Sequence, residues 1–239
     1  MPEELSQSTI PKTLDEFRGS EQIVAPPRNE KIPDVQRQEW PTSGKNCLVI
    51  IPTKNEEKVQ ACETKFKNDK TNNIGDYFFL QIPVPDEGLC QPLNGQGYVC
   101  ARLRITKAID IFRNNYPAYL EDNHIGTIIV TAIENFFERD NVPRPVDAAA
   151  GGMFNVLTGK METNTSKGST LDPWFLAEAE RSGGFADNNK DCLRTTAGEI
   201  VAETIPGVNK ADWHAVAVNK PRREFLAEML EEMEIPWNE

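Results

Sequence analysis

Two arginines and a lysine precede a single carboxylate in a pattern that suits phosphate chemistry. Arg102, Arg104 and Lys107 fall at the start of an expected helix, and Glu134 ends an apolar run further along the chain. The planar guanidinium group matches phosphate oxygens, and a carboxylate is a hard ligand for a divalent ion. The set therefore indicates a site for a polyphosphate and its metal. Two alternatives remain: a solvated basic helix face, and a Glu134 that pairs with one of the arginines as structure.

A second polar group follows the first apolar run of the chain. Thr53, Lys54, Asn55 and Lys58 come directly after residues 47–51, where the chain is expected to enter a helix. The start of a helix offers backbone N–H groups to an anion, and the two lysines add positive charge. We expect these residues to contact phosphate, although an ordinary capped helix with solvated charges has the same pattern.

Hydrolysis of a phosphoanhydride needs a divalent ion to neutralise charge and a base to orient water. Glu134 is assigned as the catalytic carboxylate and as a metal ligand, and one carboxylate is too few for a metal site. Asp147 is the expected second ligand, with Glu57 and Asp86 as further candidates. The sequence thus predicts a site for a divalent metal ion.

These groups require a scaffold of strands and helices. Apolar runs predict strands over residues 47–51, 77–84, 126–133, 148–157 and 213–218. Apolar residues at helical spacing predict helices after Asn55, from 101 to about 114, and over residues 175–181, 192–203 and 222–233. Their alternation predicts an α/β domain with a mixed central sheet and helices on both faces. Ligands bind such sheets at the carboxyl ends of strands, where the charged groups fall.

The order of these motifs resembles the DUF84 family of inosine/xanthosine triphosphatases, which are related to the inosine triphosphate pyrophosphatase fold. The resemblance spans about residues 47–232. The family's Ser/Thr-x-Asn-Pro-x-Lys turn is matched by Thr53, Asn55 and Lys58. Further matches are Gly88-Leu89-Cys90-Gln91-Pro92, Ala101-Arg102-Leu103-Arg104, Ala132-Ile133-Glu134-Asn135-Phe136 and Asp147-Ala148-Ala149. The resemblance implies a homodimer that removes phosphate from the non-canonical purine nucleotides ITP and XTP with Mg²⁺.

Several positions depart from that family pattern inside the motifs. Glu56 stands at the turn proline, Leu103 replaces the Asn between the arginines, and Asn135 and Phe136 replace two small residues. Such changes could close the pocket. The alternative function is therefore an inactive or repurposed relative, either a binding or scaffold protein or an enzyme of a specialised pathway, because a fold does not fix function.

The composition of the chain limits the classes of molecule that it is expected to bind. A net charge of −11 argues against a nucleic-acid backbone or an anionic membrane as partner, and the family resemblance implies a small-molecule nucleotide as substrate. The 5 cysteines have no paired spacing and no signal-like apolar segment precedes them, so reduced thiols in a cytoplasmic protein are expected. No run approaches the roughly 18 apolar residues of a membrane span.

The first 44 residues differ from the rest of the chain. They contain few aliphatic residues and six prolines, at positions 2, 11, 26, 27, 33 and 41. Such a composition buries too little surface to fold alone. We therefore expect a flexible proline-rich tail over residues 1–44 and one α/β domain over residues 45–239.

Overall fold

A mixed sheet of seven strands lies at the centre of the computed structural model, which describes residues 10–18, 21–27, 30–70, 74–85, 90–186 and 189–238. Its strands are β1 (Ile23–Val24), β2 (Asn46–Ile51), β3 (Tyr77–Gln81), β5 (Ile125–Glu138), β6 (Val146–Asn155), β7 (Met161–Thr165) and β8 (Gly168–Thr170). The strand order is β1-β8-β6-β5-β2-β3, with β7 also paired to β6. β2 runs parallel to β3 and β5, whereas β6 is antiparallel to β5. The predicted mixed α/β architecture is confirmed.

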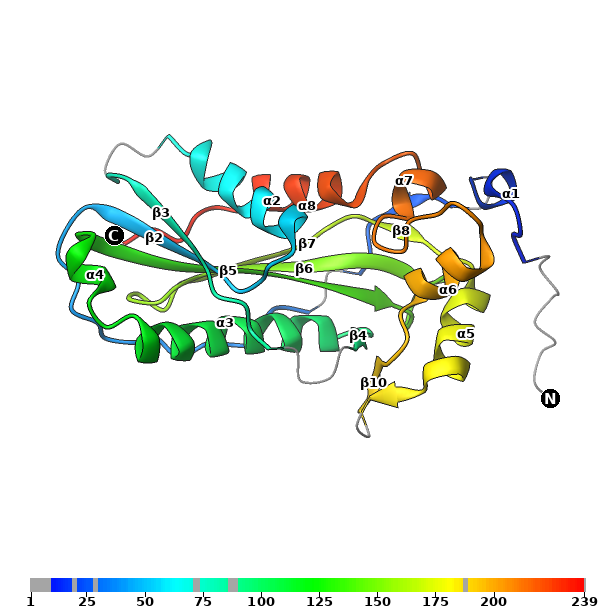
Figure 1. Ribbon diagram of the computed structural model, residues 1–239, viewed down its shortest axis with the longest axis horizontal. Helices are drawn as coiled ribbons and strands as arrows, with labels where there is room; N and C mark the ends of the chain where they lie inside the picture. The colour runs from blue at the N-terminus through cyan, green and yellow to red at the C-terminus, as the bar shows by residue number, and fades with distance from the viewer. Residues whose placement is uncertain are drawn as a thin grey trace.

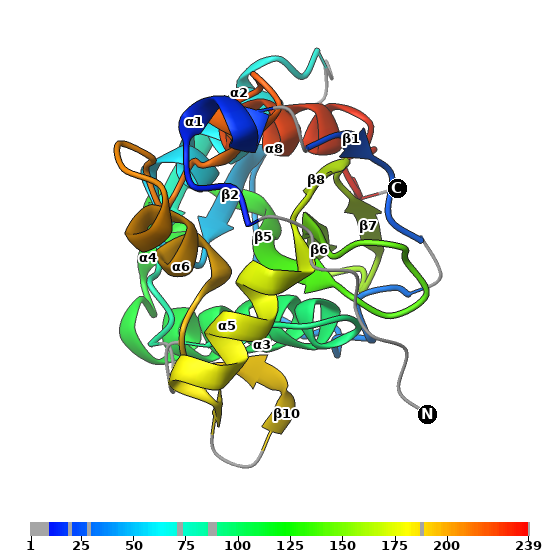
Figure 2. The same cartoon turned by 90° about the vertical axis from the view of Figure 1, so that its right-hand side faces the viewer.

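Helices cover both faces of this sheet (Figures 1 and 2). They are α1 (Leu14–Arg18), α2 (Glu56–Lys67), α3 (Gln96–Asn115), α4 (Tyr119–Asp122), α5 (Pro173–Gly183), α6 (Ala197–Thr204), α7 (His214–Ala217) and α8 (Arg222–Glu231). α2 and α8 lie side by side on one face, and α3 runs along the other. A second, three-stranded sheet has the order β4-β10-β9, with β4 (Gln91–Pro92), β9 (Phe185–Ala186) and β10 (Asn189–Leu193).

Successive side chains of β5 pack alternately against the two helical layers. Ile129 and Ile133 pack in the cluster under α2 and α8, while Ile128, Val130 and Ala132 pack in the cluster under α3. Successive side chains of a strand point to opposite faces, so a strand covered on both sides must be apolar throughout. This accounts for the strands predicted at residues 47–51, 126–133 and 148–157, which the structure confirms as parts of β2, β5 and β6.

The predicted helices α2 and α3 follow from local capping and periodicity. Asn55 is the N-cap of α2, and its side chain accepts the backbone N–H of Lys58 at 3.0 Å. On α3, Ala101, Ile105 and Phe112 are buried against the sheet as their spacing predicts. Both elements therefore begin close to the carboxyl end of β2 or its neighbouring loops, where the site is expected.

Two element predictions are wrong. Residues 213–218 form the short helix α7 instead of a strand, because Trp213, His214 and Ala217 are buried at helical spacing. Residues 192–203 split into the end of β10 and the helix α6, whose N-cap Thr196 forms a reciprocal capping box with Glu199. An apolar run of four to eight residues does not distinguish a strand from a buried helical turn, which explains the first error.

The segment over residues 1–44, which we expected to be a tail, packs on the rest of the domain in the part that the structure describes. Phe17 of α1 is fully buried between Phe175 and Trp213, with ring centroids at 6.0 Å from each. β1 adds a strand to the edge of the sheet beside β8. Trp40 stacks on Phe112 at 5.1 Å. The segment cannot fold alone, but it gains burial from the rest of the domain, which composition does not reveal.

The cysteines do not all carry free thiols. Cys90 and Cys192 form a disulfide across 102 residues of sequence, whereas Cys47, Cys62 and Cys100 carry thiols that are outside any disulfide. The expectation of reduced thiols throughout is therefore wrong for one pair, because the fold brings the two residues together from distant segments. Among the described residues, every helix is too short or too polar to cross a lipid bilayer.

Candidate functional site

The site begins where β2 stops and β5 continues. Pairing between these parallel strands ends at Ile50 and Val130, while β5 runs on to Glu138. Further along the same strand, Leu93 bridges to Phe137. Between these points Lys58 of α2 reaches the strand, and its Nζ donates to the carbonyl oxygen of Ile133 at 2.9 Å. A cation therefore binds the backbone of β5 at the carboxyl end of β2, which is the edge where α/β sheets hold ligands.

Glu134 follows Ile133 and points toward the face that α3 covers. Its side chain is buried, and Oε2 accepts a hydrogen bond from Nε of Arg104. Lys58 and Arg104 thus contact adjacent residues of β5 from opposite faces of the sheet. The sequence left open whether Glu134 pairs with an arginine as structure, and the structure shows this ion pair.

Asp147 occupies the other face. It pairs with Phe137 in the β5–β6 register, an odd number of residues from Glu134, so the two carboxylates project from opposite sides of the sheet. Oδ2 of Asp147 accepts from Nη2 of Arg222 at 2.5 Å and lies 3.2 Å from Nε2 of His214. Oδ1 is buried and has no hydrogen-bond partner within the described residues.

Charge and burial oppose each other in this cluster. Burial would raise the pKa of Asp147, but the Arg222 guanidinium and His214 hold that pKa below its ordinary value. Burial and the charge of Arg222 lower the pKa of His214, against the opposing effect of Asp147. Asp147 is therefore ionised and His214 neutral near pH 7, which leaves one negative charge beside one guanidinium.

A pocket of about 430 Å³ adjoins both carboxylates. Its polar lining consists of the cations Arg194, Lys210 and Arg222, the carboxylates Glu134, Asp147 and Glu199, and the side chains of Gln91, Asn135 and Thr196. Gln91 Oε1 accepts the N–H of Ala197 at 2.8 Å and so ties β4 to the start of α6. The pocket combines three cations with hard oxygen ligands, which is a suitable environment for a phosphorylated molecule with a metal ion.

Two of the predicted phosphate ligands near β2 accept hydrogen bonds from backbone N–H groups. Oγ1 of Thr53 accepts the N–H of Asn55 at 3.1 Å, and Asn55 in turn caps α2. Lys54 is exposed, and Lys58 is the member of this group that reaches β5. The turn therefore positions Lys58, while Thr53 and Asn55 maintain its shape.

The arginines of α3 do not act as a pair. Residues two apart on a helix are separated by about 200°, so Arg102 and Arg104 flank opposite sides of the buried stripe. Arg104 reaches Glu134, and Lys107 lies one turn further along on the same side as Arg104. Arg102 therefore points away from the carboxylate that the sequence placed beside it.

Three other sequence candidates have different outcomes. Glu57 is half-buried, and burial and Asp212 raise its pKa while Arg222 and Arg223 act in the opposite direction. It therefore lies toward α8. Phe136 is fully buried and packs on Tyr98 with a centroid distance of 5.3 Å, so it does not fill the pocket. Asp86, together with Gly88 and Leu89, lies outside the described residues.

Sequence reasoning missed Arg194 and Lys210. They come from the irregular segments around α6, whose position over the carboxyl edge of the sheet no local pattern reveals. The capping box of Thr196 and Glu199 was a readable signal for the start of α6. The structure also places Arg222, at the start of α8, against Asp147.

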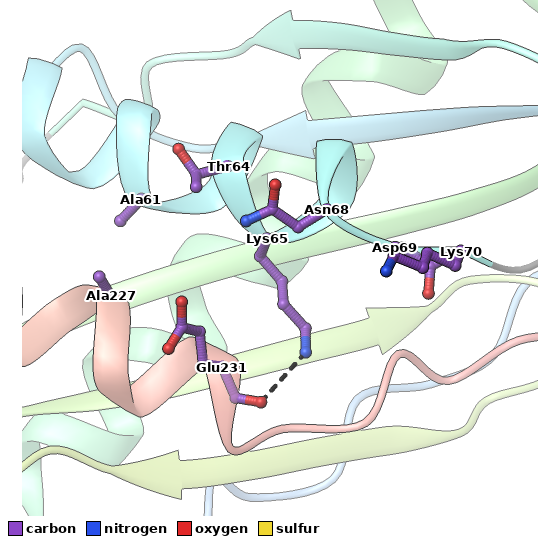
Figure 3. Close-up of a pocket in the computed structure, with 8 residues that line it drawn as sticks. All are labelled: Ala61, Thr64, Lys65, Asn68, Asp69, Lys70, Ala227 and Glu231. Atoms are coloured by element: carbon purple, nitrogen blue, oxygen red, sulfur yellow. Dashed lines mark hydrogen bonds between the residues drawn. The ribbon is translucent and has the colours of Figure 1, made fainter.

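Another hollow, of about 330 Å³, lies between the ends of α2 and α8 (Figure 3). There Nζ of Lys65 donates to the backbone carbonyl of Glu231 at 3.3 Å, at the C-terminal end of α8. A lysine at that position offsets the partial negative charge of the helix end. This contact explains Lys65 as a link between two helices.

The chain was compared with known proteins. No protein-family model and no curated protein sequence matches it. Among solved structures it is similar to protein VC0702 from Vibrio cholerae, with a TM-score of 0.51 and 14% sequence identity over 78% of this chain and 92% of that chain. At this identity the likeness concerns the fold alone, and it supports the mixed α/β architecture.

Proposed function

We propose that the protein hydrolyses non-canonical purine nucleoside triphosphates such as ITP and XTP with Mg²⁺. The convergence of Lys58, Arg104 and Glu134 on β5, at the carboxyl end of β2, is the observation that carries the proposal. The cations of the adjoining pocket support it, because a triphosphate carries several negative charges and the chain as a whole is acidic. The choice of ITP and XTP rests on the resemblance to inosine/xanthosine triphosphatases.

The donor set fits Mg²⁺ in part. Mg²⁺ is held by one or two carboxylates together with phosphate oxygens and water. Glu134 is an oxygen donor of this kind, whereas Asp147 projects from the other side of the sheet, and no cluster of three or more His, Cys, Asp or Glu side chains occurs among the described residues. When bound to Glu134, Mg²⁺ would neutralise phosphate charge.

The residues of the chain have separate tasks in this proposal. Arg104 moves its guanidinium from Glu134 to the phosphates, with which its planar group forms paired hydrogen bonds. Lys58 and Arg194 contribute further positive charge, which stabilises the negative charge that develops on the transferred phosphoryl group. Glu134 accepts a hydrogen bond from the attacking water and orients it toward phosphorus.

The experiment measures phosphate and pyrophosphate release from ITP, XTP, GTP and ATP, with Mg²⁺ and with a chelator. Glu134→Gln should lower turnover of ITP or XTP by about 10² or more. Glu138→Gln, at the half-buried end of the same strand and outside the pocket lining, is the matched control and should retain activity. Activity that survives in Glu134→Gln contradicts the role of Glu134, and no turnover of any nucleotide contradicts the whole proposal.

A second candidate is a relative that binds a ligand without hydrolysing it. The observation that favours it is the pairing of both carboxylates with arginines, Glu134 with Arg104 and Asp147 with Arg222. Ion pairs of this kind reduce the capacity of a carboxylate to hold a metal. Calorimetry distinguishes the two functions: a nucleotide that binds in the presence of Mg²⁺ and is recovered intact supports the binding protein.

A further inference from the structure

One wall of the pocket is held by the Cys90–Cys192 disulfide. Cys90, Gln91 and Pro92 line the pocket on one side, and Arg194 and Thr196 line it close to Cys192. The bond therefore joins two chain segments that both contribute to the candidate site. The mechanism outlined above makes no use of either cysteine.

The backbone pairing in this wall is short among the described residues. β4 contains two residues, one of them a proline without an N–H, and it pairs with β10 only through Cys192–Pro92 and Leu193–Gln91. The N–H of Leu93 adds one hydrogen bond to the carbonyl of Asp191 at 2.8 Å. Small sheets of this size are marginal in water. The covalent bond therefore adds to the buried contacts of Leu93 and Leu193 as a constraint on how β4 sits against β10.

The chemistry of the two sulfur atoms is unequal. Cys90 is partly exposed and faces the pocket, whereas Cys192 is 2% exposed. An incoming thiolate therefore reaches Sγ of Cys90 first. Arg194 and Lys210 line the same pocket beside Glu134, Asp147 and Glu199, so an anionic thiol such as glutathione meets cations there as well as carboxylates. By contrast, Cys47 and Cys62 are fully buried, where thiols are inert.

We propose that Cys90 and Cys192 form a redox switch in which the disulfide locks the pocket wall and a small anionic thiol of the glutathione class unlocks it. The thiolate attacks Sγ of Cys90, the S–S bond breaks, and its electron pair leaves with Sγ of Cys192, which takes up a proton. A second thiolate then displaces Cys90 from the mixed disulfide. The products are two protein thiols and one oxidised glutathione, and the reverse reaction with oxidised glutathione restores the lock.

Reduction of the disulfide changes the pocket wall through Gln91. This residue lines the pocket and its Oε1 holds the N–H of Ala197, the first residue of α6. When β4 is released, that contact loosens together with the Leu93–Asp191 hydrogen bond, and the pocket loses its defined wall. The consequence for phosphorylated ligands rests on the proposed function, whereas the change in the wall does not.

The first test maps the thiols of the full chain by alkylation and mass spectrometry. Without reductant, Cys47, Cys62 and Cys100 should be labelled under denaturing conditions, and Cys90 and Cys192 only after reduction. Exposure of the reduced protein to oxidised glutathione should protect the same two residues again. Labelling of Cys90 and Cys192 that persists after this oxidation overturns the proposal.

The second test compares the oxidised and reduced protein by hydrogen exchange. Reduction should accelerate exchange at the amides of Leu93 and Ala197 and leave those of the β2–β5 ladder unchanged. The double variant Cys90→Ser/Cys192→Ser should behave as the reduced protein under both conditions, and Cys100→Ser, which keeps the pair, should respond as wild type. Unchanged exchange at Leu93 and Ala197 on reduction overturns the switch.

Inorganic pyrophosphate serves as the probe of the pocket. Reduction should weaken its binding, measured by calorimetry, by roughly tenfold, which corresponds to about 1.4 kcal/mol. Equal affinity for pyrophosphate in the two redox states means that the pocket wall does not control ligand binding. If pyrophosphate binds neither state, the proposed function fails, and the exchange at Leu93 and Ala197 still decides the switch.

Discussion

Arg104 on α3 donates from Nε to Oε2 of Glu134 on β5, 30 residues further along the chain. Glu134 is 7% exposed, and the side chain of Arg104 is 20% exposed. A buried carboxylate needs such a partner, because an unpaired charge in the interior is costly. The pair therefore fixes the middle of α3 against the strand that carries the candidate site, and a phosphorylated ligand must compete with Glu134 for Arg104.

Removal of one partner should be more damaging than removal of both. Arg104→Met leaves the carboxylate of Glu134 without this guanidinium and should lower the free energy of unfolding by about 2–4 kcal/mol. The double variant Arg104→Met/Glu134→Met removes both charges from the interior and should recover much of that loss. Urea denaturation of the two single variants and the double variant measures the coupling.

Arg102→Met is the matched control for this cycle. Arg102 lies on the opposite flank of α3, and its replacement should change stability by no more than about 0.5 kcal/mol. Equal losses at the two arginines, or effects that simply add in the double variant, mean that the Arg104–Glu134 pair contributes no specific stabilisation.

Gly97 gives α3 its close approach to the sheet. A Cβ at this position would lie 2.6 Å from Cγ of Phe136, which is fully buried. Gly97→Ala gains about 1 kcal/mol of helix propensity, but overpacking costs about 1–3 kcal/mol, so we expect a net loss of stability. The melting temperature should fall, and Phe136→Leu in the same chain should restore part of it. A more stable Gly97→Ala protein contradicts the packing of Phe136 under α3.

Much of the architecture was predictable because it depends on local patterns. The strand at residues 47–51 is apolar at every position, the α3 stripe repeats at 3.6 residues, and Asn55 caps α2 as its residue type suggests. The errors share a different cause. Trp213 and His214 are helical because they are buried by tertiary packing. The segment around Phe17 is folded only because Phe17 packs between Phe175 and Trp213.

The site was predictable in part for a similar reason. Lys58 lies in the first turn of α2, directly after β2, so its contact with β5 follows from the topology of a parallel sheet, whereas Arg104 and Glu134 meet in the middle of α3 and within β5. Asp147 was identified, but its face was not, because the face depends on the register between β5 and β6. Arg194 reaches the pocket from the short connection between β10 and α6, and Lys210 from the connection between α6 and α7, and packing alone sets the paths of both.

The docking of the N-terminal segment makes a direct prediction. Phe17→Ala removes a fully buried aromatic ring and should lower the free energy of unfolding by about 3–5 kcal/mol, since large-to-small changes leave a cavity. Leu103→Ala on α3, where the side chain is 38% exposed, is the control and should be nearly neutral. Chemical denaturation measures both. An unchanged midpoint in Phe17→Ala means that the segment is not part of the folded domain.

The lowered pKa of His214 should make the stability of the protein depend on pH. Its folded-state pKa is lowered by burial and by Arg222 from an ordinary value of 6.5, so the unfolded chain takes up a proton before the folded protein does. Stability should therefore be constant above about pH 7 and fall as the pH drops below 6.5 toward the folded-state pKa. Asp147 adds a second loss below 3.8, because its folded-state pKa is also lowered.

The urea midpoint between pH 8 and pH 5 measures the contribution of His214. His214→Gln keeps an N–H that can reach Asp147 but does not titrate, so the decline below pH 6.5 should largely disappear in this variant. His124→Asn is the matched control, because residue 124 has a φ of 50°, which Asn tolerates, and it should retain the wild-type pH dependence. If the decline persists in His214→Gln and disappears in His124→Asn, then His124 causes it. That outcome excludes a buried neutral His214 as the cause.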